Sequence, residues 1–277
     1  MIMLPEIPPH QLAPSQYPLV RHLGVEPHLS LVIKAVIAGH SPASIWVDEG
    51  PRPQTALLWD KGHCLYVLSA AASAPSWLHT LIHQTIIPEA RARHIRLLKV
   101  YHQEAGWADI IPTLLAPLAL TLKARAFYRL DPSYVPGTIP VPPGFTLQPI
   151  TAPLLANDDL ENIQSLRNEI ASCWPTLARF LRHGFGFCLV HGTKLVSWCT
   201  AEYRSAGQCG VGIETIEAYQ GRGLATAAAL AFVTHSQKHR LVPHWDSWQA
   251  NTPSLAVAQK AGFRHLLDYT VHLGFLS

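Results

Sequence analysis

A turn with two glycines, Gln220-Gly221-Arg222-Gly223-Leu224-Ala225, separates an apolar stretch from an alanine-rich one. Glycine has no Cβ, so the backbone of such a turn can approach a ligand closely. A helix is expected over about Gly223–His239, and the first N–H groups of a helix have no partners inside it. These groups and the positive end of the helix dipole favour a phosphate or pyrophosphate. The stretch therefore predicts a phosphate-binding turn, in which Arg222 supplies a further charged donor.

The alternative is an ordinary connection between a strand and a helix, which two glycines also allow. The sequence contains neither GxxxxGK[ST], the phosphate loop of many nucleoside triphosphatases, nor GxGxxG, the fingerprint of dinucleotide-binding folds. A phosphate-binding turn here would therefore belong to a different class of nucleotide- or cofactor-binding protein. A second motif is needed to identify that class.

Two motifs together resemble the GCN5-related N-acetyltransferase (GNAT) superfamily. Gln220-x-x-Gly223-x-Ala225 matches the Q/R-x-x-G-x-G/A motif of the family. Asn251-Thr252-Pro253-Ser254 opens an expected helix that finishes in Lys260-Ala261-Gly262-Phe263, as the last helix of the family commonly does. Three further runs, at 184–188, 212–215 and 244–247, resemble the branch that includes the zwittermicin A resistance acetyltransferase. The clear motifs cover roughly residues 184–263.

The resemblance implies acetyl-CoA as co-substrate and direct attack by an amine within a ternary complex. The strand before the turn would part from its neighbour and pair with the pantetheine arm, and the turn would bind the pyrophosphate. Asn251 would contact the cofactor near its thiol, although Asn also suits a helix N-cap. The implied cofactor residues are Ile213, Glu214, Thr215, Gln220, Gly221, Arg222, Gly223, Leu224, Ala225, Thr226 and Asn251.

The reaction needs a base, because a protonated amine must lose its proton before it attacks a thioester. Glu214 lies on the strand beside the expected thioester and is the first candidate for a catalytic residue. Glu202 is the second, followed by Asp246 and His244. A backbone N–H near Thr215 could polarise the carbonyl.

The family's usual general acid is missing. Many members carry a tyrosine seven residues after the Asn251 position, and this chain has Ala258 there. Ser254 or a water could protonate the thiolate, or the thiolate could leave unprotonated. The missing tyrosine also keeps open a catalytically silent acyl-CoA sensor.

The acceptor is the least determined part of the function. A small amine, such as an antibiotic-like or amino-polyol metabolite, follows from the branch resemblance. Acylation of a protein or peptide amine is the first alternative, and an open groove would favour it. Binding of CoA without turnover on a broad panel of amines would favour the sensor.

The expected fold is α/β with a mixed sheet. A GNAT-like catalytic domain is expected at 145–277, preceded by a Pro-rich linker at 131–144. A smaller, divergent α/β domain is expected at 1–130, and one interpretation is that it is a degenerate copy of the same fold. Helices are expected at Val25–Ala38, at Trp77–Ile87 with Pro88 ending it, and from Trp107, with strands at Ser44–Val47, Thr55–Trp59, His63–Leu68 and Ile95–Tyr101. In the second domain, strands are expected at Phe145–Pro149, Phe187–Val190, Leu195–Glu202, Gln208–Thr215, His244–Gln249 and from Arg264, and helices at Asp158–Cys173, Leu177–His183, Gly223–His239 and Pro253–Ala261.

Composition narrows the class of protein. Among 277 residues only 14% are charged and the net charge is +3, with no run of Lys and Arg, which speaks against a nucleic-acid partner. No signal peptide and no apolar stretch of membrane-spanning length is expected. Five Cys without a CxxC pair fit reduced thiols in the cytoplasm, and 16 scattered His predict no metal site. The oligomeric state is left open.

Overall fold

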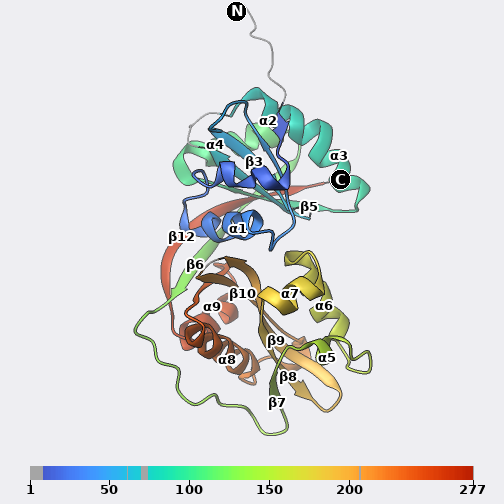
Figure 1. Ribbon diagram of the computed structural model, residues 1–277, viewed down its shortest axis with the longest axis vertical. Helices are drawn as coiled ribbons and strands as arrows, with labels where there is room; N and C mark the ends of the chain where they lie inside the picture. The colour runs from blue at the N-terminus through green and yellow to red at the C-terminus, as the bar shows by residue number, and fades with distance from the viewer. Residues whose placement is uncertain (1–8, 61, 70–73, 206, 277) are drawn as a thin grey trace, which may run out of the picture. The chain divides into compact units, whose positions relative to one another are not determined.

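The computed structural model describes residues 9–60, 62–69, 74–205 and 207–276. The chain divides into two compact units (Figure 1). The first consists of Met1–Ala124 and Tyr269–Ser277, and the second of Arg125–Asp268. The expected boundaries at 131 and 145 do not coincide with this division, because the C-terminal strand returns to the first unit.

The first unit is a mixed sheet with strands in the order β1-β2-β3-β4-β5-β12, in which only β4 and β5 are parallel. Its strands are β1 (His10–Gln11), β2 (Ser44–Val47), β3 (Thr55–Trp59), β4 (Cys64–Ser69), β5 (Leu97–His102) and the end of β12 (Phe263–Phe275). Its helical segments are η1 (Pro14–Val20), α1 (Pro27–Ile37), α2 (Ser76–Leu81), η2 (Ile82–Ile86), α3 (Ile87–Ala92) and α4 (Glu104–Leu115).

A cluster of buried apolar residues joins the sheet of the first unit to α2, α3 and α4. Trp59 and Leu65 on the strands pack with Leu78 and Trp107 on the helices. The helix predicted to end at Pro88 continues to Ala92, so that prediction is wrong. Pro88 lacks an N–H and lies in the first turn of α3, and the wide π turn η2 directly before it lets the helix continue through this position.

The second unit is a mixed sheet with strands in the order β6-β11-β10-β9-β8-β7, in which only β10 and β11 are parallel. Its strands are β6 (Ala119–Leu130), β7 (Thr146–Pro149), β8 (Gly186–His191), β9 (Lys194–Ser205), β10 (Gln208–Thr215) and β11 (Val242–Trp248). Its helical segments are α5 (Ala152–Leu155), α6 (Ile163–Cys173), α7 (Leu177–His183), η3 (Glu217–Tyr219), α8 (Leu224–Lys238) and α9 (Thr252–Lys260).

Helices cover both faces of the second sheet (Figure 1). Alternate strand residues such as Cys199 and Val211 pack with α8 and α9, while their neighbours such as Trp198 pack with α6 and α7. This alternation follows from the twofold side-chain period of a strand. Four alanines of α8 are buried, which lets that helix lie close to the sheet: Ala227, Ala228, Ala229 and Ala231. The mixed α/β fold is confirmed.

The two halves of the chain repeat one topology. Each half begins with antiparallel strands, the last of which is connected through helical segments to a strand parallel to it. Another helix and a last strand follow in each half. The last strands are exchanged, because β6 pairs with β11 and β12 pairs with β5. Strand β6 was not predicted from the sequence, in which Lys and Arg interrupt its apolar residues.

No helix of the described residues is long and apolar enough to cross a membrane.

Candidate functional site

Strands β10 and β11 part halfway along their length. Their parallel pairing covers only Gln208 to Gly210 on β10, although β10 continues to Thr215. On its other side β10 stays paired with β9 as far as Thr215. The last part of β10 therefore has one edge without a strand partner, which is the geometry that the family resemblance implies.

The backbone groups at this edge belong to alternate residues. Ile216 donates its N–H to Val196 on β9, so the backbone of Ile216 and Glu214 faces β9. The backbone of Ile213 and Thr215 consequently faces the opening. The Thr215 N–H is bound by the Glu214 carboxylate (3.2 Å), and the Thr215 carbonyl accepts from the Gln220 side chain (3.2 Å).

The glycine turn follows the open edge and leads into α8. Gly221 and Gly223 have φ values of +74° and +80°, a region that favours glycine, and a Cβ at either would meet no atom within 4 Å. Within the described part of the chain, no hydrogen bond uses the backbone N–H of residues 221–226. Six consecutive donors are thus free at the N-terminus of a helix that contains 15 residues.

The polar side chains of the turn bind its own backbone. The Arg222 guanidinium donates to the Ala218 carbonyl (3.1 Å) and lies 5.2 Å from the centre of the Tyr219 ring. Leu224 is buried in the core and anchors the start of α8. These contacts hold the turn without occupying its amides.

Asn251 and Ala258 lie on α9, beyond β11. Asn251 is the N-cap, and its Oδ1 accepts from the Ser254 N–H (3.2 Å). Ser254 in turn accepts from the Trp245 indole (3.1 Å), so its hydroxyl proton remains available. Ala258 is fully buried in the core and has no group that could donate a proton.

Glu214 points to the α6 face of the sheet, opposite α8. It pairs across the strands with Trp198, which packs with α6, whereas Ile213 packs in the cluster that contains α8. Glu202 lies on the same face as Glu214, since a Cβ at Gly212 would come within 2.6 Å of the Glu202 Cγ. The structure thus places both predicted carboxylates on one face.

A third carboxylate, Glu169 on α6, joins them and was not predicted from the sequence. It accepts hydrogen bonds from the Trp198 indole and from the Thr200 hydroxyl, the latter at 3.0 Å. Burial raises its pKa, these two hydrogen bonds lower it, and the negative charge of Glu214 raises it. The only sequence signal is its position next to Ile170 at the edge of the buried stripe of α6.

The raised pKa of Glu169 predicts a specific pH dependence of stability. The folded protein keeps this proton at pH values where the unfolded chain has lost it, so this group lowers the free energy of unfolding as pH rises through the window above the ordinary carboxyl pKa. Glu169→Gln removes that loss, and its stability relative to wild type should therefore increase between acid and neutral pH. Urea unfolding over this range measures the difference, and Glu217→Gln, an exposed charge removal, should show no such trend. A difference that is constant with pH would contradict the assignment.

The two runner-up bases are engaged elsewhere. Asp246 forms an ion pair with Arg125 (2.9 Å), which also lies over Trp248 at 4.4 Å. His244 is buried, edge-on to Phe127. Cysteine chemistry is also disfavoured, because burial raises the pKa of Cys188 to about 12 and that of Cys199 well above its ordinary value.

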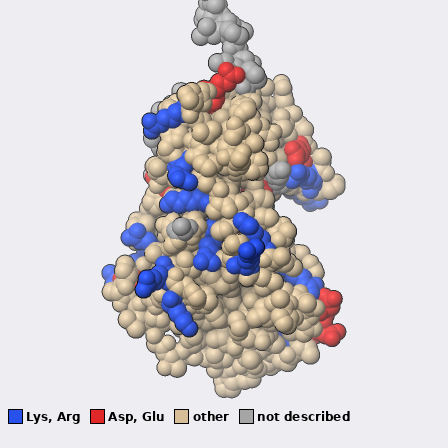
Figure 2. Space-filling model, in the orientation of Figure 1, with Lys and Arg blue, Asp and Glu red and all other residues tan. Residues whose placement is uncertain are grey.

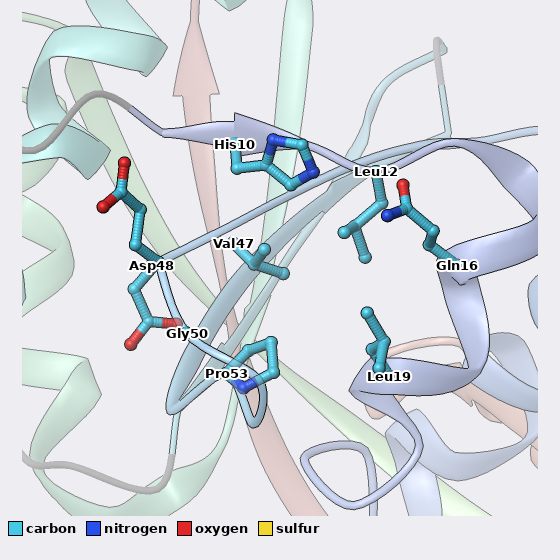
Figure 3. Close-up of a pocket in the computed structure, with 9 residues that line it drawn as sticks. His10, Leu12, Gln16, Leu19, Val47, Asp48, Gly50 and Pro53 are labelled. Carbon is cyan, nitrogen blue, oxygen red and sulfur yellow. The ribbon is translucent and has the colours of Figure 1, made fainter.

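The parallel strands of the first unit, β4 and β5, differ from β10 and β11 in their pairing. They stay paired from Cys64 to Val67, so the described strands leave no opening there. A cavity of about 210 Å³ lies instead beside β1, with His10, Val47 and Pro53 around it (Figure 3). The nearby Asp48 carboxylate is bound by the backbone N–H groups of Gln54 and Thr55, and no metal-binding cluster of His, Cys, Asp and Glu occurs among the residues described.

Comparison with known proteins matches residues 22–272 to the family model of the GNAT acetyltransferases. The chain belongs to the GNAT acetyltransferase family. It is therefore a GNAT N-acetyltransferase, and membership implies acetyl-CoA as the acyl donor. The prediction of an enzyme is confirmed.

Known relatives are distant. The chain is 26% identical over 184 residues to a Bacillus subtilis (strain 168) protein named uncharacterized N-acetyltransferase YdfB, which covers 66% of this chain and 69% of that protein. A GCN5-related N-acetyltransferase-like protein from Streptococcus suis 89/1591 superposes with a TM-score of 0.71 at 18% identity, over 94% of this chain and 98% of that one.

A tandem GNAT protein from the clavulanic acid biosynthesis pathway, solved without AcCoA, gives a TM-score of 0.62 at 17% identity over 98% of both chains. This similarity shows the fold alone. It agrees with the repeated topology of the two halves.

Proposed function

We propose that this enzyme transfers the acetyl group of acetyl-CoA to a primary amine of a small molecule, by direct attack within a ternary complex. The observation that supports this most is the parting of β10 and β11 directly before six free amides at the start of α8. An open strand edge can pair with the amide groups of pantetheine, and the free amides suit a pyrophosphate. An ordinary connection between a strand and a helix leaves about four free amides, but it needs neither the parting of the strands nor the further free amides of a glycine turn.

The cofactor would lie along these groups in order. The amides of residues 221–226 bind the pyrophosphate, and the backbone of Ile213 and Thr215 pairs with the pantetheine arm. Thr215 would exchange its bonds to Glu214 and Gln220 for bonds to pantetheine. Asn251 keeps its side-chain N–H groups for the cofactor, since only its oxygen serves the N-cap.

Glu214 is the proposed base. A thioester that reaches through the open edge from the α8 side meets the carboxylate of Glu214 on the α6 side, near those of Glu169 and Glu202. This acidic surrounding favours a cationic acceptor, and Glu214 is the exposed member of the three that can take a proton from it. Glu169 and Glu202 would position the amine by charge.

Ser254 is the proposed proton donor for the leaving thiolate. It lies one turn before Ala258 on α9, and its hydroxyl accepts from Trp245, which leaves its proton free to donate. Ser254 acts as a relay, in which its proton passes to the thiolate while its oxygen takes a proton from a solvent water, so that no serine alkoxide is formed. A water held by Ser254 would serve equally. Either route removes the need for the family's tyrosine.

A small-molecule acceptor is favoured over a protein. Three short runs resemble the zwittermicin A resistance branch, and the carboxylates suit an amine with more than one positive charge. A protein or peptide amine and a silent sensor are the alternatives. We also propose a cytoplasmic location, which the five buried free cysteines support.

Release of free thiol from acetyl-CoA tests this function directly. The full chain is assayed against amino sugars, amino polyols, polyamines, amino acids and lysine-containing peptides. Turnover with a small polyamine or amino polyol, with the acetylated amine found by mass spectrometry, supports the proposal. Turnover with peptides alone would establish the first alternative, and saturable acetyl-CoA binding without turnover on any amine would establish the sensor.

A further inference from the structure

The Pro-rich segment at 131–144 is fixed to the helices of the second unit and is no free linker. The Tyr134 carbonyl accepts from the Gln237 side chain on α8 (2.6 Å), and its hydroxyl donates to the Lys260 carbonyl at the end of α9 (3.3 Å). The Asp131 N–H donates to the Gly262 carbonyl (3.0 Å).

Gly262 allows this attachment. Its φ is +88°, and a Cβ there would come within 2.2 Å of the Tyr134 ring. The Tyr134 ring therefore lies directly on the glycine that follows α9. Further along the segment, Ile139 packs against the core cluster that contains α8.

Further along, the segment forms one wall of a groove beside the turn. Pro140, Val141 and Pro142 face Arg222, Gly223, Thr226 and Lys260 across a cavity of about 310 Å³. We call this cavity the proline groove. Its volume is at the lower end of the range of small-molecule sites. It is continuous with the free amides of the turn, because Gly223 and Thr226 belong to both.

The proline groove combines an apolar wall with two cations. Among the described residues no carboxylate forms an ion pair with Arg222 or Lys260. Among the charged side chains on the visible face of the second unit, Figure 2 shows more Lys and Arg than Asp and Glu. A ligand that carries a flat apolar group and a phosphate matches both parts of the groove.

We propose that the proline groove holds the adenosine end of CoA, with Lys260 paired to its 3′-phosphate. This inference rests on the proposed function, in which the pyrophosphate lies on the adjacent turn. The groove begins where that pyrophosphate ends, and the adenosine is the next part of the molecule. The segment that joins the two halves thus becomes part of the cofactor site and selects CoA over its dephosphorylated form.

Calorimetric titration of the full chain with CoA and with 3′-dephospho-CoA tests the pairing. Wild type should bind CoA about tenfold more tightly, as expected for one charge-assisted contact. Lys260→Gln should lose this preference and keep the wild-type affinity for dephospho-CoA. Lys238→Gln, an exposed charge removal on α8, is the matched control and should keep the preference.

A second pair of variants tests the wall. Val141→Asp places a carboxylate in the groove and should weaken CoA about tenfold, whereas Val135→Asp, at an 83% exposed position of the same segment, should not. Equal binding of both nucleotides by wild type, or a preference that survives Lys260→Gln, overturns the inference and leaves the proposed function intact. Failure of both nucleotides to bind overturns both.

Discussion

Glu214→Gln is expected to lower kcat about 10²- to 10⁴-fold and to leave acetyl-CoA affinity within about twofold of wild type. The amide keeps the size and one acceptor oxygen, so the contact with the Thr215 N–H can persist. It cannot accept a proton from the amine. The loss should be largest where the wild-type base is ionised and the amine is still protonated, and should shrink at high pH, where the amine deprotonates in solution.

Steady-state kinetics over a range of pH measures this effect. Glu217→Gln is the matched control, because Glu217 is exposed on η3, three residues further along, and has no proposed role. Wild-type turnover by Glu214→Gln at every pH would show that Glu214 is not the base. In that case Glu202, on the same face, becomes the residue to test.

Gly223→Asp is expected to weaken acetyl-CoA binding about a hundredfold. A carboxylate about 5 Å from a phosphate charge costs roughly 3 kcal/mol at an effective dielectric constant of about 20. A Cβ at this position meets no atom within 4 Å, so the cost to the fold comes from the positive φ and not from a clash of the Cβ. Equilibrium titration with acetyl-CoA measures the loss.

Two control variants separate charge from backbone strain. Gly223→Asn has nearly the same size without the charge, and Asn tolerates a positive φ better than most residues, so its affinity should fall much less. Gly192→Asp places the same residue at a φ of +59° in the β8–β9 hairpin, also with no atom within 4 Å. It should show a similar loss of stability and keep full affinity. Equal affinities of Gly223→Asp and wild type would displace the pyrophosphate from this turn.

The elements around the glycine turn could be predicted from sequence, because their signals are local. Two glycines, an alanine-rich helix and an asparagine N-cap each act within a few residues, and the structure shows the helices at Leu224–Lys238 and Thr252–Lys260. The parting of the strands could only be inferred from the family, because the bulge in β10 between Cys209 and Val211, where the pairing with β11 ends, is visible only in the structure.

Features that depend on distant partners could not be predicted. Helix α7 and strands β8 and β9 lie between Glu169 and the strand that carries Glu214. Only the packing of α6 on the sheet brings the two charges together. The attachment of the Pro-rich segment depends on the fit of Tyr134 to Gly262, for which repeated prolines give no signal.

The exchange of last strands is the clearest case. Strand β6 belongs to the first half in sequence, yet Arg125 to Arg129 pair with β11 in the second unit. A boundary placed by composition at the Pro-rich segment would therefore remove a strand from the second unit. Expression of residues 145–277 alone would leave the β11 edge uncovered, so functional tests need the full chain.

Calorimetric titration of the full chain with acetyl-CoA shows directly whether the open edge of β10 and the glycine turn form the cofactor site. We expect saturable binding in the micromolar range with one acetyl-CoA per chain, because β10 and β11 part directly before the glycine turn, whereas β4 and β5 stay paired from Cys64 to Val67. The same titration of Gly223→Asp should show weak or undetectable heat. No saturable binding by wild type would contradict the account.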